Sequence, residues 1–383
     1  MAIQKTIGSL LFCSFIAFSM AGIGRGLDAQ AQSINVSSDT AASKAAQVNF
    51  VHPGILNTKS GLDHIAADIA SGNTTRLAAY KRVTDFIETA HYPTSFPSTI
   101  YVGSNGHTSP SKNQIRANAE LAYAYALKFA ATADTAAANK CIYILNGWAY
   151  NFKNYTTIDS TDNPNQPCLE TSWTTPSFVA AAEIIRHYKP KGVTASWSKK
   201  DIQQFCTYLR LVKNNYMDKI PNYKNNWNVS AGYAKIAIGV FLDDQAIYDD
   251  GKKVLNTVLP QAIKEDGTMP ELCVRKDCVH FQYSLTGLTY AAEIAHISGD
   301  NSIYNALDGR ISKGYQFLDK AFAHTAGCDV CGKRSELFPG IEVALMHYGW
   351  TQIEQLRDKQ GPLGLPRDYT FLGFTTYTHY KLK

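Results

Sequence analysis

The chain carries three polar motifs in close succession, Asn222-Tyr-Lys-Asn-Asn-Trp-Asn228, Glu265-Asp-Gly-Thr-Met-Pro-Glu271 and Arg275-Lys-Asp-Cys-Val-His-Phe-Gln-Tyr283. Between the first two, residues 229–263 repeat apolar side chains with the period of two amphipathic helices. Such a helical hairpin brings residues near 226 and near 283 to one end of adjacent helices. The stretch therefore predicts a helical fold that gathers an amide, a guanidinium, an imidazole and a phenol in one place.

The rest of the chain repeats this pattern, with helix-like periods separated by Gly, Pro, Asn and Asp and almost no strand-like alternation. The expected helices span residues 60–71, 74–90, 112–131, 135–152, 175–188, 199–217, 229–242, 245–263, 279–298, 302–323, 336–348 and 351–360. Short connections favour antiparallel pairs, and the absence of a repeat of fixed length disfavours a regular solenoid. The expected fold class is all-α, an (α/α) toroid or incomplete barrel of antiparallel helix hairpins over residues 51–383.

The first 31 residues have the features of a secretory signal peptide: Lys5, an apolar run over residues 7–23 and the small-residue site Ala29-Gln-Ala31. A membrane anchor is the alternative, but Ser, Gly and Cys interrupt the apolar run. Residues 32–50 are rich in Ser, Ala, Thr and Gln and are expected to form a flexible leader. We therefore expect a protein that is secreted, or periplasmic in a bacterium, with no membrane contact after signal removal.

Composition places the chain among soluble globular proteins, with 45% apolar and 18% charged residues. The formal net charge of +5 is a mild bias that suits an acidic polymer. No stripe of Lys and Arg interleaved with aromatic residues is present, so nucleic acid is not an expected partner. The expected protein is a monomer that acts on a polyanion.

Signal removal leaves the cysteines Cys141, Cys168, Cys206, Cys273, Cys278, Cys328 and Cys331. In an exported protein these predict disulfides with one thiol left over. The closely spaced pairs Cys273/Cys278 and Cys328/Cys331 also match a four-thiolate zinc site. Disulfides are preferred because both spacings can close small loops in an oxidising compartment. No metal or other cofactor is predicted.

Several motifs resemble the alginate lyase superfamily of all-helical polysaccharide lyases. They are His52-Pro-Gly-Ile-Leu, Leu121-Ala-Tyr-Ala-Tyr-Ala-Leu, Cys141-Ile-Tyr-Ile-Leu-Asn-Gly-Trp, Asn225-Asn-Trp, Asp266-Gly and Arg275 followed by His280-Phe-Gln-Tyr. The resemblance covers roughly residues 51–350. It implies that residues 51–383 form a lyase domain that cleaves an acidic polysaccharide by β-elimination, without an obligatory cofactor.

One position departs from the family pattern. Family members commonly place a His directly after the paired Asn, where this chain has Trp227. Either Trp227 offers a stacking surface for a sugar ring in place of that His, or the role of base has moved to His280 or Tyr283. The departure leaves two β-1,4-linked polyuronates open as substrates, alginate in its polymannuronate form and glucuronan.

Elimination at a 4-linked uronate requires a neutralised carboxylate, a base near the C5 hydrogen and a proton for the departing C4 oxygen. In β-linked mannuronate that hydrogen and that oxygen lie on the same face of the ring, so one phenol could serve both. Tyr283 is assigned this role, although a Tyr on an amphipathic helix can equally be packing. His280, on the same helical face, is a base or carboxylate partner, or a structural His. Asn226 and Arg275 would neutralise the carboxylate.

The expected substrate-binding residues are Trp227, Asn225, Trp173, His107 and Gln282. The two Trp residues are candidate sugar platforms, with core packing as the alternative. Asn225 could instead cap a helix. His107 lies in a Gly-rich loop that could close over the substrate.

Two other kinds of protein remain open. A glycoside hydrolase on the same toroid would draw its two carboxylates from Glu265, Asp266, Glu271 and Glu170. A non-catalytic protein would hold a polyanion without turnover, as the missing His suggests. The products distinguish the three, because only a lyase creates an unsaturated uronate.

Overall fold

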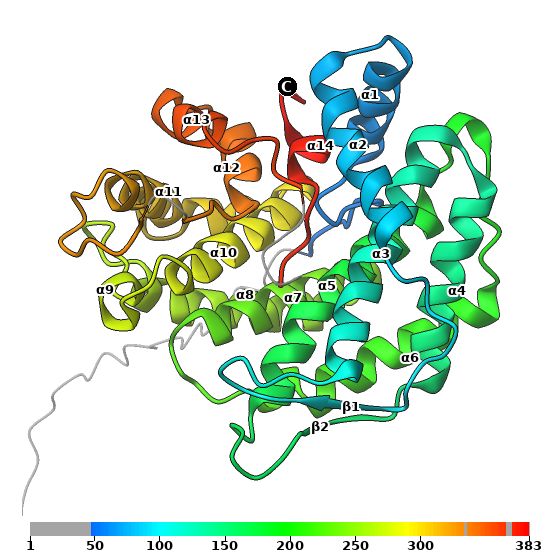
Figure 1. The fold of residues 1–383 in the computed structure, drawn as a ribbon, viewed down its shortest axis with the longest axis horizontal. Helices are drawn as coiled ribbons and strands as arrows, with labels where there is room; N and C mark the ends of the chain where they lie inside the picture. The colour runs from blue at the N-terminus through cyan, green and yellow to red at the C-terminus, as the bar shows by residue number, and fades with distance from the viewer. Residues whose placement is uncertain (1–46, 333–334, 365–369, 383) are drawn as a thin grey trace, which may run out of the picture. The chain divides into compact units, whose positions relative to one another are not determined.

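The helical periods of the sequence become α-helices throughout the computed structural model, which describes residues 47–332, 335–364 and 370–382 (Figure 1). The α-helices are α1 (Lys59–Ala70), α2 (Thr74–Thr89), α3 (Pro110–Thr132), α4 (Thr135–Asn151), α5 (Gln166–His187), α6 (Lys199–Asn215), α7 (Asn226–Phe241), α8 (Gln245–Ala262), α9 (Glu271–Arg275), α10 (His280–Ile297), α11 (Ser302–Phe322), α12 (Gly340–Tyr348), α13 (Thr351–Asp358) and α14 (Thr375–His379). Short 3₁₀ turns lie at Pro190–Gly192 and Met217–Lys219. The strands β1 (Thr99–Val102) and β2 (Asn154–Thr157) pair in parallel.

Helix starts follow side-chain caps that can be found in the sequence. Ser109, Asp134 and Ser198 each accept a backbone N–H of the first turn of α3, α4 and α6. The largest difference between an expected and an observed helix start involves proline. Helix α5 begins at Gln166 rather than Thr175, because Pro167 suits its first turn and Pro176 lies inside the helix. Four- and five-residue elements such as β1, β2, α9 and α14 carry too few residues for a period to show.

The helices form an inner and an outer layer. The inner helices α3, α5, α7, α10 and α12 contact one another in chain order, and α14 completes the ring by contacting α12, α1 and α2. Helices α5, α7 and α10 are buried almost all round, whereas the outer helices α6, α8 and α11 bury one face. This arrangement of the described residues confirms the expected all-α toroid.

The inner helices all start at the same end of the ring. Lys112 of α3, Gln166 of α5 and Tyr283 of α10 line one cavity, and Phe338, just before α12, contacts Tyr283. Asn226, the first residue of α7, is hydrogen-bonded to the loop that leads to α10. We call this end the N-terminal mouth and the opposite end the C-terminal mouth. Helix macrodipoles make the N-terminal mouth favourable for anions and the C-terminal mouth favourable for cations.

The last described segment, residues 370–382, enters the centre of the ring (red in Figure 1). Gly373 donates its N–H to Glu120 of α3, and Tyr290 of α10 donates to the carbonyl of Leu372. The Phe371 ring packs on Tyr283, Tyr290 and Tyr233. The segment therefore fills the core and supports the first turn of α10 from behind.

Burial raises the pKa of Glu120 to about 8, against a lowering contribution from the Gly373 N–H. Because the pKa of Glu120 is higher in the folded state, the folded protein is most stable at a pH below the unfolded pKa, where the carboxyl is protonated in both states. The free energy of unfolding then falls as pH rises through about 8. We expect Glu120→Gln, which keeps the acceptor for Gly373, to be more heat-stable than wild type at pH 8 but not at pH 4.5. At pH 8 the free energies of unfolding of the two proteins should differ by several kcal/mol, since one pKa unit corresponds to about 1.4 kcal/mol. Thermal unfolding at several pH values checks this, and a gap between the two Tm values that does not change with pH would contradict it.

The expected disulfides are present. Disulfides join Cys273 to Cys328 and Cys278 to Cys331, so each closely spaced pair is linked crosswise to the other rather than within itself. Among the described residues three thiols remain, Cys141, Cys168 and Cys206, so the expectation of a single unpaired thiol was wrong. The same four cysteines that could have bound zinc are used in these bridges.

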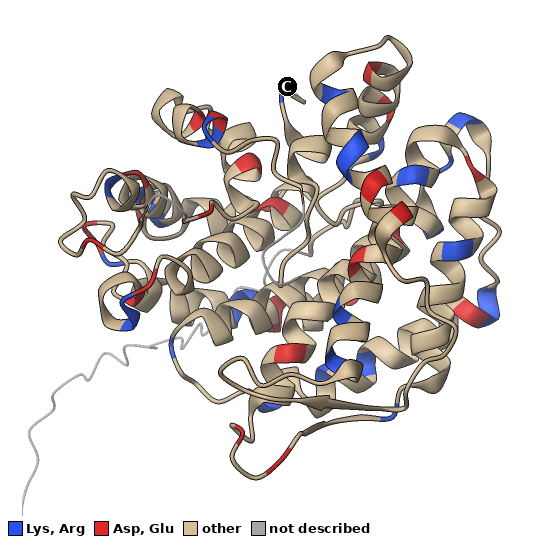
Figure 2. Ribbon diagram, viewed as in Figure 1, with Lys and Arg blue, Asp and Glu red and all other residues tan. Residues whose placement is uncertain are grey.

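The signal peptide and most of the predicted leader lie outside the described residues. Residues 47–50 of that leader are packed: the Val48 N–H donates to Gln245, and the Phe50 ring meets Tyr248 edge to face. Within the described residues no helix combines the length and apolar character needed to cross a bilayer. Figure 2 shows acidic and basic residues interspersed over the described helices, without a continuous basic stripe.

Candidate active site

A cavity of about 450 Å³ opens at the N-terminal mouth. Its lining combines two aromatic rings, two cationic side chains and several amides: Gly103, Asn105, Gly106, Thr108, Lys112, Asn113, Arg116, Gln166, Trp173, Tyr283 and Thr370. Aromatic faces with a few polar groups are typical of sugar sites, and the cations suit an acidic sugar. Two of the predicted residues, Tyr283 and Trp173, therefore share one cavity.

Tyr283 is held by aromatic neighbours on several sides. Its ring stacks on Trp173 with centroids 5.6 Å apart and meets Phe338 and Phe371 at 5.0 and 5.9 Å. The Trp173 Nε1 donates to Ser230, and the Arg116 guanidinium lies over the Trp173 ring. Tyr283 is 7% exposed, and because it lines the cavity its accessible part faces that space. Packing thus fixes the phenol beside a potential sugar platform.

Asn226 and Arg275 lie near Glu271 rather than near Tyr283, whereas His280 lies near both. The Asn226 Nδ2 donates to Glu271 Oε1 at 2.8 Å, and the Ser284 hydroxyl donates to Oε2 at 2.8 Å. Burial raises the pKa of Glu271, while the hydrogen bonds and the charges of His280 and Arg275 oppose that rise. Together these groups hold the Glu271 carboxyl beside Ser284, the residue that follows Tyr283.

This geometry changes the role expected of Asn226. The side chain is 1% exposed and does not line the cavity, and neither does its partner Glu271, so Asn226 positions Glu271 and does not face the cavity itself. Glu271 itself was considered only as a hydrolase carboxylate. The four-residue spacing from Glu271 to Arg275 could have indicated that the two side chains share one helical face. A five-residue helix, however, is too short to be recognised in the sequence.

His280 is oriented by a carboxylate. Its Nδ1 lies 2.8 Å from Asp277 Oδ2, and Asp277 also accepts the backbone N–H groups of Val279 and His280. The imidazole meets the Tyr283 ring edge to face with centroids 5.7 Å apart. The structure therefore brings His280 and Tyr283 together, as their spacing predicted. Arg275 is exposed, and neither Arg275 nor His280 is among the residues that line the cavity.

Two predicted substrate contacts have structural roles. Gln282 is 2% exposed, and its amide bonds the carbonyls of Cys278 and Glu336 and the N–H of Phe338, so the expectation that it binds substrate was wrong. Asn225 caps α7 by accepting the Trp227 N–H, which is the alternative role foreseen for it. Trp227 is half-buried against Tyr223, at 4.9 Å between ring centroids, and does not line the cavity.

His107 anchors the loop of residues 103–108, several of which line the cavity. Its Nδ1 lies 3.1 Å from Asp162, which also accepts the Ser104 N–H. Gly103, whose Cβ would fall 2.5 Å from the His107 carbonyl oxygen, allows this close turn. Loop residues on either side of His107 line the cavity while His107 turns to Asp162. His107 thus positions the loop and is not itself among the residues that line the cavity.

The hydrolase interpretation finds little geometric support. Glu170 is fully buried and holds Arg116 in a two-pronged ion pair, and Glu271 is engaged by Asn226 and Ser284. Asp266 is exposed and caps the turn at Thr268. Neither Glu170 nor Asp266 is placed as a general acid in the cavity.

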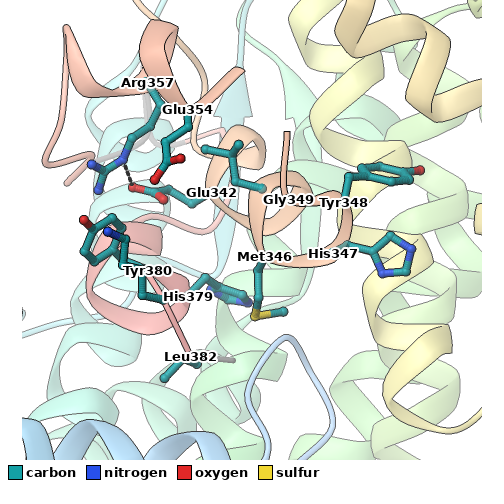
Figure 3. A pocket seen from close by; sticks show the side chains of 12 residues that line it. Glu342, Met346, His347, Tyr348, Gly349, Glu354, Arg357, His379, Tyr380 and Leu382 are labelled. Atoms are coloured by element: carbon teal, nitrogen blue, oxygen red, sulfur yellow. Dashed lines mark hydrogen bonds and ion pairs between the residues drawn. The ribbon is translucent and has the colours of Figure 1, made fainter. Parts of the chain in front are cut away.

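Another cavity, of about 360 Å³, lies at the C-terminal mouth between α12, α13 and α14 (Figure 3). Its Arg357 is paired with Glu342, and Glu354 adds a further carboxylate to the lining (Figure 3). Its two cations, Arg357 and Lys381, are balanced by the two carboxylates, so it lacks the excess of cations found at the N-terminal mouth. It suits an acidic polymer less well.

The two disulfides fasten the segment that carries Glu271 and Arg275. Replacing both Cys273 and Cys328 by Ser should lower stability by about 2–4 kcal/mol and should also lower kcat, because α9 would lose the bridge within it and keep only the one at Cys278. Thermal unfolding together with turnover per folded molecule measures both effects. Cys206→Ser, which removes a free thiol, is the matched control. An unchanged kcat in the double variant would show that the bridge does not position α9.

Comparison with known proteins adds to this geometry. A family profile described as alginate lyase matches residues 67–325. Alginate lyase A1-III from Sphingomonas species A1 is similar in structure, with a TM-score of 0.59 and 17% identity over 80% of this chain and 94% of that chain. The structure of its tyrosine-to-phenylalanine variant complexed with a tetrasaccharide has a TM-score of 0.58 and 18% identity, over 79% of this chain and 94% of that chain. A search of curated proteins found no similar sequence. The structural likeness concerns the fold, whereas the profile covers more than half of the chain.

Proposed function

The chain belongs to the alginate lyase family and is a polysaccharide lyase acting on an acidic polysaccharide, and from this premise we propose that it cleaves a β-1,4-linked polyuronate by β-elimination with Tyr283 as acid and base. The observation that carries the proposal is the placement of Tyr283. Its ring lines the cavity at the N-terminal mouth, stacked on Trp173, one residue before the Ser284 that binds Glu271.

The uronate carboxylate is assigned to the Glu271 cluster. Burial raises the pKa of Glu271, which extends to higher pH the range in which its carboxyl is protonated and can donate a hydrogen bond to the substrate carboxylate. Asn226 and Ser284 hold the Glu271 side chain in place, and Arg275 adds positive charge. Together they stabilise the negative charge that grows on the carboxylate as the C5 hydrogen leaves.

Tyr283 carries both proton transfers. As phenolate it accepts the C5 hydrogen, the C4–O bond breaks while a C4=C5 double bond forms, and the phenol returns a proton to the departing oxygen. In mannuronate and glucuronate the C5 hydrogen and the C4 oxygen lie on the same face of the ring, so one group can reach both. In guluronate they lie on opposite faces. The geometry therefore favours polymannuronate or glucuronan, and it needs no His at the position of Trp227.

The substrate preference can be tested on purified protein with polymannuronate, polyguluronate, glucuronan and glycosaminoglycans. We expect the ultraviolet absorbance of unsaturated uronate to rise with polymannuronate or glucuronan and far more slowly with polyguluronate. Failure to produce this absorbance from any polyuronate would refute the proposed function. A faster rise with polyguluronate would refute the single-phenol mechanism while leaving the lyase activity intact.

We also propose that the protein works after export, in secreted or periplasmic form. The pair of disulfides at the active site supports this, since such bridges persist in oxidising compartments. Mass spectrometry of the protein from the culture medium or periplasm should find an N-terminus after Ala31. Recovery of the activity only from the cytosol, with residues 1–31 retained, would contradict export.

A further inference from the structure

A cluster of metal-ligating side chains lies at the C-terminal mouth, away from the proposed active site. His52 Nδ1 is 3.0 Å from Glu183 Oε1, and His187 Nε2 is 3.9 Å from the same oxygen. The three donor atoms all lie within 4.8 Å of one another. In a tetrahedral zinc site with bonds of about 2.0–2.1 Å, donor atoms are roughly 3.3 Å apart. The set is therefore close to the size of a metal centre with two His ligands and one Glu ligand.

The outer groups are arranged as they are around bound metals. His52 Nε2 lies 3.0 Å from Asp243 Oδ1, and the Gly54 N–H donates to Glu183 Oε2 at 3.0 Å. A metal-ligating His usually donates its second ring nitrogen to a carboxylate, and a ligating carboxylate usually accepts a further hydrogen bond. Both supporting bonds are already present here.

Local charge also favours a cation. Glu183 and Asp243 contribute two carboxylates, and a divalent ion would balance them with both His rings neutral. The cluster lies where α5 ends, at His187, and just beyond the end of α7, at Phe241. The carbonyl ends of helices attract positive charge. Arg186 already donates to the Phe241 carbonyl at the end of α7 and balances part of this negative charge. The site thus combines a ligand set, two carboxylates and the carbonyl end of α5.

An ion pair between His52 and Glu183 explains only part of this cluster. The Nε2 of His187 is buried without a hydrogen-bond partner among the described residues, although it points toward Glu183 at 3.9 Å. An unpaired buried nitrogen is unfavourable unless something occupies its lone pair. The His52 and His187 rings stack with centroids 4.3 Å apart, so metal binding requires the His187 ring to turn, which no hydrogen bond from Nε2 opposes.

We propose that His52, Glu183 and His187 bind one divalent transition-metal ion such as Zn²⁺, with Asp243 orienting His52. The ion would join residue 52, near the start of the described chain, to the ends of α5 and α7 and so stabilise the toroid. The proposal does not depend on the assigned lyase chemistry. Spacing along the chain does not reveal the site, because His52 lies 131 residues before Glu183.

The test uses the mature protein after chelation of bound metal, titrated with ZnCl₂ by calorimetry and followed by thermal unfolding. Wild type should bind one zinc per chain at this site and gain several degrees in Tm. His187→Gln should weaken zinc binding at least tenfold and remove the gain in Tm, while its Tm in chelator stays near that of wild type. Asp243→Asn should weaken binding about 10- to 100-fold through the orientation of His52.

His107→Gln is the matched control, because His107, Asp159 and Asp162 form the other group of possible ligands in the described chain. This variant should keep the zinc-induced rise in Tm. Zinc binding that is absent in wild type, or equal in wild type and His187→Gln, would overturn the proposal and leave an ion pair at this position. Loss of zinc stabilisation in His107→Gln alone would assign the metal to the loop over the cavity and would equally overturn it.

Discussion

Tyr283→Phe is expected to lower kcat by about 100- to 10,000-fold while the Kd for the polymer changes by no more than about threefold. The substitution removes only the hydroxyl, so the ring should keep its stacking on Trp173 and its contacts with Phe338 and Phe371. Because the phenol is assigned both proton transfers, its loss affects the chemical step rather than binding. Initial rates of ultraviolet absorbance and calorimetric titration of the polymer measure the two quantities separately.

Tyr290→Phe is the matched control for this prediction. Tyr290 lies on the same helix, fully buried, and donates to the Leu372 carbonyl. Its substitution should lower Tm and leave kcat per folded molecule close to that of wild type. A Tyr283→Phe variant that turns over within tenfold of wild type would remove the phenol from the mechanism.

Glu271→Ala is expected to lower kcat by about 100- to 1,000-fold, the usual effect of removing one hydrogen-bond donor to a developing negative charge. It also leaves the amide of Asn226 and the hydroxyl of Ser284 without their acceptor. Glu271→Gln keeps a neutral donor in the same place and should retain much more activity. Steady-state kinetics of the two variants make this comparison.

The pH dependence separates a chemical role of Glu271 from a structural one. Burial raises the pKa of Glu271, so wild type should lose kcat as pH rises through that pKa and this carboxyl ionises beside the substrate carboxylate. Glu271→Gln cannot ionise and should lose that decline. Asn225→Ala, which removes only the cap of α7, should cost about 1 kcal/mol of stability and leave the profile unchanged. A decline with rising pH that persists unchanged in Glu271→Gln would show that Glu271 only supports the fold.

The sequence predicts the helices well where caps and apolar periods are both local. Ser109 and Asp134 mark helix starts by their own side chains, so α3 and α4 were placed within two residues of their observed starts. The start of α5 was missed because Pro176 lies inside the helix, in a place where proline more often marks a boundary. The layering of the helices followed from the pattern, whereas the entry of residues 370–382 into the ring depends on contacts such as Gly373 to Glu120 that no local pattern encodes.

The site was predictable only in part, for a related reason. His280 and Tyr283 lie three residues apart on one helix, so their proximity follows from helical geometry. Gln282 belongs to the same motif, but its side chain points to the loop before α12. There its amide donates to the Glu336 carbonyl and accepts the Phe338 N–H. The bond from Asn226 to Glu271 spans 45 residues, and the cations Lys112 and Arg116 come from a helix still further away in the chain. Such pairings depend on the closed ring rather than on spacing.

The most direct test of elimination is to cleave the preferred polyuronate in water labelled with oxygen-18 and to weigh the products. Elimination breaks the C4–O bond without adding water, so we expect new chain ends that are unsaturated, carry no label and weigh one water less than hydrolysis products. Saturated products that carry one labelled oxygen would contradict the account.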